Sequence, residues 1–167
     1  MIIINDNLLP NTNKIYCVQN KVEATWGAAN FYIDDLGLED GKEYTISFDV
    51  LNLSEKSRGV VGVFVTNTKG SQDTFKINLK ASGRVNTTFK YDENGSKRIG
   101  LTPGPTGNAG GCGADFYRIK LEKGKNATAF IINKNDVKLD NQAIFPIGGV
   151  SRTLSSIEDI RGLVYVN

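Results

Sequence analysis

Carboxylates are the side chains best suited to acid–base chemistry in this chain, because its 167 residues include no histidine. Pairs of neighbouring acids occur at residues 34–35, 39–40, 92–93 and 158–159. Cleavage of a glycosidic bond needs two carboxyl groups roughly 5–9.5 Å apart on either side of the bond. Acids adjacent in one turn do not face each other in this way. Serine or cysteine nucleophiles would lack their usual histidine base, so we expect a protein that is not an enzyme.

Aromatic and amide side chains supply a different chemistry, that of sugar binding. A flat ring stacks on the C–H face of a pyranose, and nearby amides bond its hydroxyl groups. Trp26, the sole tryptophan, stands beside Gly27 and other small residues and is the best candidate for an exposed platform. We expect Tyr32 and Asn108 as further glycan contacts. A sole tryptophan in a sandwich is, however, more often a core residue, because large aromatic residues are mostly buried.

Residues 100–113 form a glycine-rich stretch that invites comparison with phosphate-binding loops. The stretch lacks the Gly-Lys-Ser/Thr ending that such loops use, and no evident helix follows it. We therefore expect a surface loop, which can form the rim of a ligand groove. The net charge is only +2, with acids and bases interspersed. Because no basic stripe could neutralise phosphates, we expect no nucleic-acid partner.

Short strands separated by turn signals must position these residues. Alternating apolar and polar residues predict half-buried strands, and the more continuously apolar run at 59–65 predicts a strand buried on both faces. The expected strands are 14–18, 24–33 with a break at Gly27, 44–53, 59–65, 74–79, 86–91, 97–101 and a closing strand from about 114. Residues 92–95 have the composition of a hairpin turn. The spacing is typical of an all-β antiparallel sandwich, and a jelly roll fits the strand count.

Alternation also assigns faces to individual side chains. Residues 117, 119 and 121 of the closing strand fall on one face, and residues 118, 120 and 122 on the other. Four phenylalanines of the alternating strands are expected to fill the core: Phe48, Phe64, Phe75 and Phe89.

Three short phrases go beyond what generic strands require. Residues 120–124 read Lys-Leu-Glu-Lys-Gly and are followed by Ala-Thr-Ala at 127–129. Residues 7–11 read Asn-Leu-Leu-Pro-Asn, and residues 44–48 read Tyr-Thr-Ile-Ser-Phe. In this order and spacing, the phrases resemble those of jelly-roll modules similar to carbohydrate-binding modules, which recur in phage tail, baseplate and fibre proteins.

The resemblance implies a non-enzymatic phage virion structural protein, assembled in the cytoplasm of the host bacterium. It implies that the sandwich is displayed on a capsid, tail or baseplate for adhesion to bacterial surface glycans. The alternative is a structural decoration or connector protein. Sugar-binding jelly rolls often hold a structural calcium near the first and last strands. The matching residues here are Asp115 with Asn5 or Asp6.

The resemblance does not cover the end of the chain. We expect a sandwich at residues 1–132 and a C-terminal extension at 133–167 that is too small to form a core alone. The extension either packs back on the sandwich or docks on another subunit, and we favour docking. Other virion proteins and a homo-oligomer are then the expected partners. The residues expected to dock are Phe145, Ile147, Leu163 and Tyr165.

The cysteines and the beginning of the sequence bear on the compartment. Residues 1–5 are not typical of a signal peptide, and no apolar run approaches the length of a membrane span. We expect no membrane partner and, in a reducing cytoplasm, free thiols at Cys17 and Cys112. A disulfide between them would need Cα atoms within about 7 Å of each other.

Overall fold

The computed structural model describes residues 5–67 and 73–136, together with the backbone of 144–147 and 150–153. Two 3-10 helices, η1 (Glu55–Ser57) and η2 (Lys134–Asp136), accompany strands β1 to β10 in the described ranges. Neither is long and apolar enough to cross a membrane. The strands are β1 (Tyr16–Gln19), β2 (Ala29–Tyr32), β3 (Glu43–Leu51), β4 (Val60–Thr66), β5 (Asp73–Lys80), β6 (Val85–Lys90), β7 (Arg98–Thr102), β8 (Gly113–Lys123), β9 (Ile144–Ile147) and β10 (Val150–Thr153).

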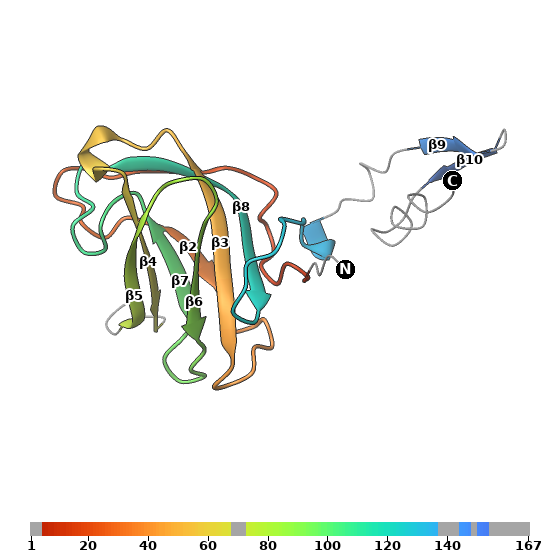
Figure 1. Ribbon diagram of the computed structural model, residues 1–167, viewed down its shortest axis with the longest axis horizontal. Coiled ribbons are helices and arrows are strands. Elements are labelled where there is room, and N and C mark those ends of the chain that lie inside the picture. Colours follow the sequence, from red (N-terminus) through yellow and green to blue (C-terminus); the bar gives the residue numbers. More distant parts are fainter. Residues whose placement is uncertain (1–4, 68–72, 137–143, 148–149, 154–167) are drawn as a thin grey trace.

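Strands β1 to β8 form two four-stranded antiparallel sheets that face each other (Figure 1). The order is β1-β8-β3-β6 in one sheet and β2-β7-β4-β5 in the other. The first strand thus pairs with the eighth, and the second with the seventh, which is the order of an eight-stranded jelly roll. The predicted all-β jelly-roll sandwich is confirmed, with strand bounds close to those expected. Strands β9 and β10 pair with each other.

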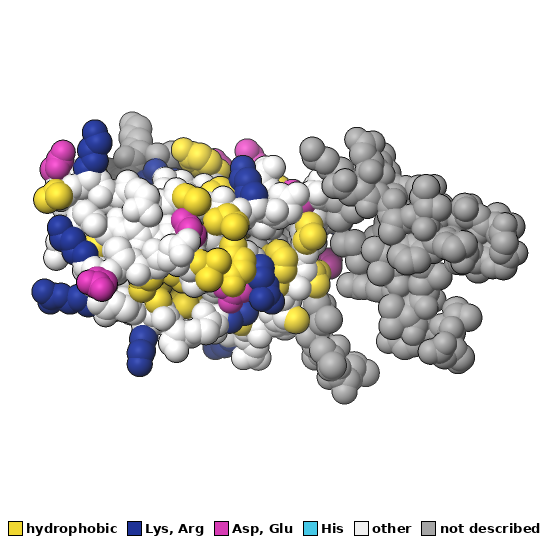
Figure 2. All heavy atoms as spheres, turned by 90° about the horizontal axis from the view of Figure 1, so that it is seen from above, with side chains coloured by type: hydrophobic (Ala, Val, Ile, Leu, Met, Phe, Trp, Pro, Cys, Tyr) yellow, Lys and Arg dark blue, Asp and Glu magenta, His cyan; other side chains and the backbone are white. Residues whose placement is uncertain are grey.

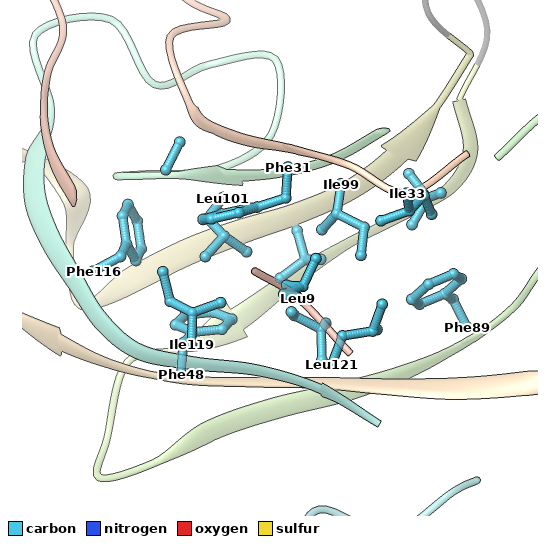
Figure 3. Close-up of a cluster of buried hydrophobic side chains, with 14 of the residues drawn as sticks. Leu9, Phe31, Ile33, Phe48, Phe89, Ile99, Leu101, Phe116, Ile119 and Leu121 are labelled. Atoms are coloured by element: carbon cyan, nitrogen blue, oxygen red, sulfur yellow. The ribbon is translucent and has the colours of Figure 1, made fainter. Parts of the chain in front are cut away.

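The core fills the space between the two sheets (Figure 3). Phe48 on β3 meets Phe116 on β8 edge to face, with ring centroids 5.6 Å apart. Phe89 is buried as predicted, and Phe75 packs against the cluster from β5. Each large apolar side chain buried in this way contributes about 1.5–3 kcal/mol. Fully buried members include Leu9, Ile33, Ile46, Ile99, Leu101, Ile119 and Leu121.

The closing strand β8 departs from strict alternation at Arg118. The backbone φ of Arg118 is 48°, in the left-handed region that few non-glycine residues adopt. The pairing register with β3 shifts opposite this point, as it does at a β-bulge. Phe116 and Ile119 consequently both face the core, while Tyr117 does not. The prediction that Tyr117 shares the face of Ile119 is therefore wrong.

The turn at residues 92–95 forms, but it does not close a hairpin. The N–H groups of Gly95 and Ser96 both donate to the carbonyl of Asp92, at 3.1 and 2.7 Å. Strands β6 and β7 lie in different sheets, so the turn carries the chain from one sheet to the other. The hairpin prediction is wrong because turn residues favour a local backbone bend and do not determine which strands pair.

A return segment, residues 124–131, packs on the outer face of β8. Beneath it lie Lys120 and Glu122, both fully buried, with Nζ and Oε2 3.4 Å apart. Glu122 accepts hydrogen bonds from the N–H and hydroxyl of Thr128, at 2.8 and 2.6 Å. Lys120 donates to the Thr128 hydroxyl and to the carbonyl of Ala129. Burial lowers the pKa of Lys120, and the neighbouring Glu122 carboxylate opposes that shift.

The phrase at residues 7–11 attaches the opening of the chain to the same strand. The buried Asn7 amide donates to the carbonyl of Ile119 at 3.0 Å and accepts from the N–H of Leu121 at 3.1 Å. Its own side chain also accepts from the N–H of Leu9, a core residue. These bonds replace a regular strand pairing at this edge.

The chain leaves the sandwich beside this opening segment. The Asn133 amide donates to the carbonyl of Asn7 at 2.7 Å. The Asp136 carboxylate accepts from the N–H groups of Asn11 and Thr12, at 2.6 and 2.8 Å. Contacts with the sandwich therefore continue past residue 132, through Asp136.

Candidate functional site

The outer face of the β2-β7-β4-β5 sheet carries polar and aromatic side chains. Cross-strand pairing places Asn30, Gly100, Phe64 and Lys76 in one row across the four strands. Tyr32 and Arg98 form a pair in the next row. Because successive side chains of a strand alternate between faces, these residues point away from the core. We call this surface the outer platform: Trp26, Asn30, Tyr32, Phe64, Lys76 and Arg98.

Phe64 is buried, but it lies on the outer platform rather than in the core. A Cβ atom at Gly100 would lie only 2.0 Å from the tip of the Phe64 ring, so the ring occupies the space that a side chain at Gly100 would need. The Arg98 guanidinium stacks on the ring at 5.7 Å from its centroid. The prediction that Phe64 lies in the core is wrong. Strand β4 is apolar on both faces, as predicted, and Phe64 is on the face that points away from the core.

Trp26 is exposed over 56% of its surface, which decides between the two positions predicted for it. Lys76 stacks its ammonium group on the indole at 4.8 Å from the ring centroid, a favourable cation–π geometry. The ring also lies against Gly107, where a Cβ would be 3.1 Å from it. Trp26 therefore extends over the outer platform from its loop and is not a core residue.

Tyr32 and Asn108 are both exposed, and they lie at different parts of this surface. Tyr32, exposed over 61% of its surface, is on β2. Asn108 follows Gly107 in the glycine-rich loop and so is close to Trp26. Strands β2 and β5 are three strand spacings apart, or roughly 14 Å. The structure thus groups Trp26 with Asn108 at one side of the outer platform and leaves Tyr32 at the other.

Three platform residues escaped the sequence analysis, namely Asn30, Lys76 and Arg98. Each occupies a polar position of an alternating strand, which is also the pattern of an ordinary solvated face. Alternation shows that these three residues lie on the outer faces of their strands. They form one surface only because β2, β5 and β7 belong to the same sheet. Sequence alone did not show that pairing.

The two acids expected to hold calcium lie far apart. Asp115 begins β8, where the Asn52 amide donates to its carboxylate at 2.6 Å. That bond and one from the exposed Cys17 thiol lower the pKa of Asp115. The segment holding Asp6 reaches β8 near Leu121, where the Leu8 N–H bonds the carbonyl. Six residues of strand, about 20 Å, separate the two positions.

Asp6, Asn5 and Asp115 therefore do not converge on one site. Among residues 5–67 and 73–136, no three side chains of the His, Cys, Asp and Glu types come together in a group that could hold a metal ion. Calcium binding stays an untested prediction. Cys17 and Cys112 are free thiols, as predicted, with Cys17 exposed and Cys112 buried.

The residues expected to dock on a second subunit lie in the last part of the chain. Phe145 and Ile147 are in β9, whose backbone pairs with β10. Leu163 and Tyr165 lie outside the described residues. Docking through these four residues stays a prediction.

No protein-family model matches this sequence, and no curated protein matches it. Solved structures with a similar fold include the tripod from the baseplate of bacteriophage Tuc2009, at 15% identity and a TM-score of 0.48. The match covers 84% of this chain and 63% of the tripod chain, so this chain spans less than two thirds of the tripod chain's length.

Carbohydrate-binding modules are also among the similar structures. A family 29 module is 16% identical with a TM-score of 0.41, covering 73% of this chain and 86% of the module. A xylan-binding domain from Paenibacillus barcinonensis is 12% identical with a TM-score of 0.40, and the match covers 76% of this chain and 97% of that domain. These solved structures include both a phage baseplate protein and carbohydrate-binding modules, each with a TM-score below 0.5.

Proposed function

We propose that this protein is a non-enzymatic component of a phage virion that binds a bacterial surface glycan through the outer platform. The observation that carries the proposal is the pair of exposed rings, Trp26 and Tyr32, on a sandwich whose other large aromatic residues are mostly buried. Exposed rings beside amide and cationic groups can stack on sugars and bond their hydroxyls. The short phrases described above support the assignment to a virion.

The arrangement suits weak binding multiplied over many copies. Exposed rings at two sides of the outer platform could contact different sugar units of one chain. A shallow surface buries little of each unit, so single-site affinity is low. Display of many copies on one particle raises the overall affinity through effective concentration. A homo-oligomer or a repeated virion position fits this use.

A pull-down of the purified full chain on bacterial cell envelopes tests the proposal, with free sugars as competitors and with or without calcium. We expect competable binding that falls about tenfold or more in Trp26→Ala, as truncation of a central aromatic contact does. Tyr117→Ala is the matched control, because Tyr117 belongs to the other sheet. Equal binding by Trp26→Ala and the wild type would exclude the outer platform as the site.

The second candidate function is that of a connector anchored through the C-terminal extension. The observation in its favour is the fixed exit of the chain, where the Asp136 carboxylate bonds the backbone of Asn11 and Thr12. An arm that leaves from a fixed point can position the sandwich on a neighbouring subunit. Deleting residues 143–167 should then prevent incorporation into particles without unfolding the sandwich. Normal assembly of the truncated protein would contradict this function.

A further inference from the structure

A cleft separates the η1 turn from the glycine-rich loop and adjoins the outer platform at Asn108. Its volume is about 410 Å³, within the range of small-molecule sites. Residues 56–58 and Val60 form one wall, and the loop forms the other with Pro105, Asn108, Gly110 and Cys112. Figure 2 views the molecule from the end of the sandwich at which Figure 1 places η1, and it shows Lys and Arg side chains interspersed with Asp and Glu side chains on this face.

The charges that line this cleft are of one sign. Lys56 and Arg58 line it, and no Asp or Glu does. Neither cation belongs to an ion pair within the described part of the chain. By contrast, Arg84, Arg118, Lys120 and Lys123 each have a carboxylate partner. The cleft thus offers two positive side chains that no carboxylate of its own wall neutralises.

The lysine fits closely against the opposite wall. A Cβ atom at Gly111 would lie 2.7 Å from the Lys56 ammonium nitrogen, so that nitrogen rests on bare backbone. Gly111 also has a φ of +71°, which a glycine adopts without strain. A side chain at residue 111 would therefore displace the Lys56 ammonium group from this contact.

Both walls are fixed to each other. The buried Ser57 hydroxyl donates to the carbonyl of Pro103. The Ser54 N–H donates to the carbonyl of Gly113 at 2.8 Å, and the Gly113 N–H donates to the Ser54 hydroxyl oxygen at 3.0 Å. Arg58 has a φ of 52° and its N–H bonds the Glu55 carbonyl at 2.9 Å. Helices commonly end in this left-handed conformation, so Arg58 caps η1 at the wall of the cleft.

We propose that this cleft binds an anionic group, a phosphate or a carboxylate, carried by the ligand of the outer platform. Lys56 and Arg58 supply charge-assisted hydrogen bonds to its oxygens, and the Asn108 amide can donate a further one. The ligand is then an acidic surface glycan, whose neutral units contact Trp26 on the other flank of the loop. The glycan part of this inference rests on the proposed function, whereas anion binding does not.

Titration of the full-length protein with glycerol 3-phosphate and with glucuronate tests the inference, with glycerol and glucose as neutral counterparts. Backbone amide NMR signals of residues 56–58 and 110–112 are the readout. We expect saturable shifts from at least one anionic probe and none from the neutral ones. The probe that binds more tightly identifies the group as a phosphate or a carboxylate. Added salt should weaken the binding, because the cations are exposed.

The double variant Lys56→Gln/Arg58→Asn should lose about tenfold or more in affinity for that probe. Asparagine is chosen at 58 because it tolerates the left-handed region. Lys42→Gln/Lys90→Gln is the matched control, removing two exposed cations outside the cleft. Absence of shifts with both anions, or an equal loss in the control variant, would overturn the inference.

Envelope binding separates this inference from the proposed function. Suppose that the wild type shows no anion-induced NMR shifts, and that the cleft variant still binds envelopes through Trp26. The cleft inference then fails and the proposed function stands. If the wild type binds the anionic probe but no envelope, the proposed function fails and the anion site stands.

Discussion

Strand β8 and the outer platform are both rich in polar side chains, but they use them in opposite ways. On β8, Lys120 and Glu122 are fully buried and bond each other and Thr128. On the outer platform, Trp26 and Tyr32 expose more than half of their surface. One region buries its polar groups beneath the return segment to hold the fold, and the other leaves its rings exposed for a ligand.

The difference shows which residues a sequence resemblance reports. The phrases at 7–11, 120–124 and 127–129 all converge on β8, where they join the opening and the return segment to the closing strand. None of their residues belongs to the outer platform. The recognisable phrases therefore report on the assembly of the sandwich, and they include no residue of the candidate ligand site.

The largest effect that separates the two regions should come from Glu122→Ala. The substitution leaves the Lys120 ammonium buried without its carboxylate, and we expect a loss of about 3–5 kcal/mol in the free energy of unfolding. Urea denaturation measures it. The protein that remains folded should bind envelopes as the wild type does, because β8 takes no part in the outer platform.

The double variant Lys120→Met/Glu122→Leu is the control for that prediction. Replacing both charges by apolar groups of similar size removes the unpaired charge, so most of the stability should return. A loss below about 1 kcal/mol in Glu122→Ala alone would show that Lys120 does not depend on its partner.

A smaller effect is expected from Gly100→Ala, which acts on the outer platform. The new Cβ would overlap the Phe64 ring, and displacing a packed ring costs about 1–3 kcal/mol. Because Phe64 belongs to the outer platform, envelope binding should fall as well. Adding Phe64→Leu should restore part of the stability, and a double-mutant cycle measures this coupling. Strictly additive effects would contradict the contact.

The smallest effect should come from Asp115→Asn at the start of β8. The folded pKa of Asp115 is lowered chiefly by the Asn52 hydrogen bond, so its stabilisation is present above the unfolded pKa near 3.9 and is lost as pH falls through the folded value. The stability gap between wild type and variant should close in that acid range. Denaturant titrations at neutral and acidic pH measure it, and a gap independent of pH would contradict the assignment.

The Cys17 thiol reports on the same contact in a second way. A hydrogen bond to Asp115 is the main cause that raises the pKa of Cys17. Asp115→Asn should therefore speed alkylation of this exposed thiol near pH 8, because the thiolate fraction increases.

Alternation and turn residues were enough to predict the strands and the jelly roll, because each strand has one face against the core. They failed where a local event overrides periodicity. The bulge at Arg118 moves Tyr117 off the core face. Gly100 gives Phe64 a place on the outer face.

The candidate sites were predictable in part. The small neighbours of Trp26 made it the best candidate for an exposed ring, although a core position is the more usual one for a sole tryptophan. Asn108 is exposed in its glycine-rich loop, and its role as a glycan contact stays a prediction. Lys76, Arg98 and the cleft cations were not predicted, because lone basic residues in turns and strands look like solvated positions. The burial of Lys120 and Glu122 likewise depends on a segment that returns over them after β8.

The bond from Asp136 to the backbone of Asn11 and Thr12 also has a mechanical meaning. Tension applied to the chain beyond residue 136 first loads these two hydrogen bonds and the Asn133–Asn7 contact. The force then spreads into the opening segment and does not peel the return segment directly from β8. When the sandwich is pulled from its C-terminal side, these three hydrogen bonds to the opening segment must therefore break before the force reaches the closing strand β8.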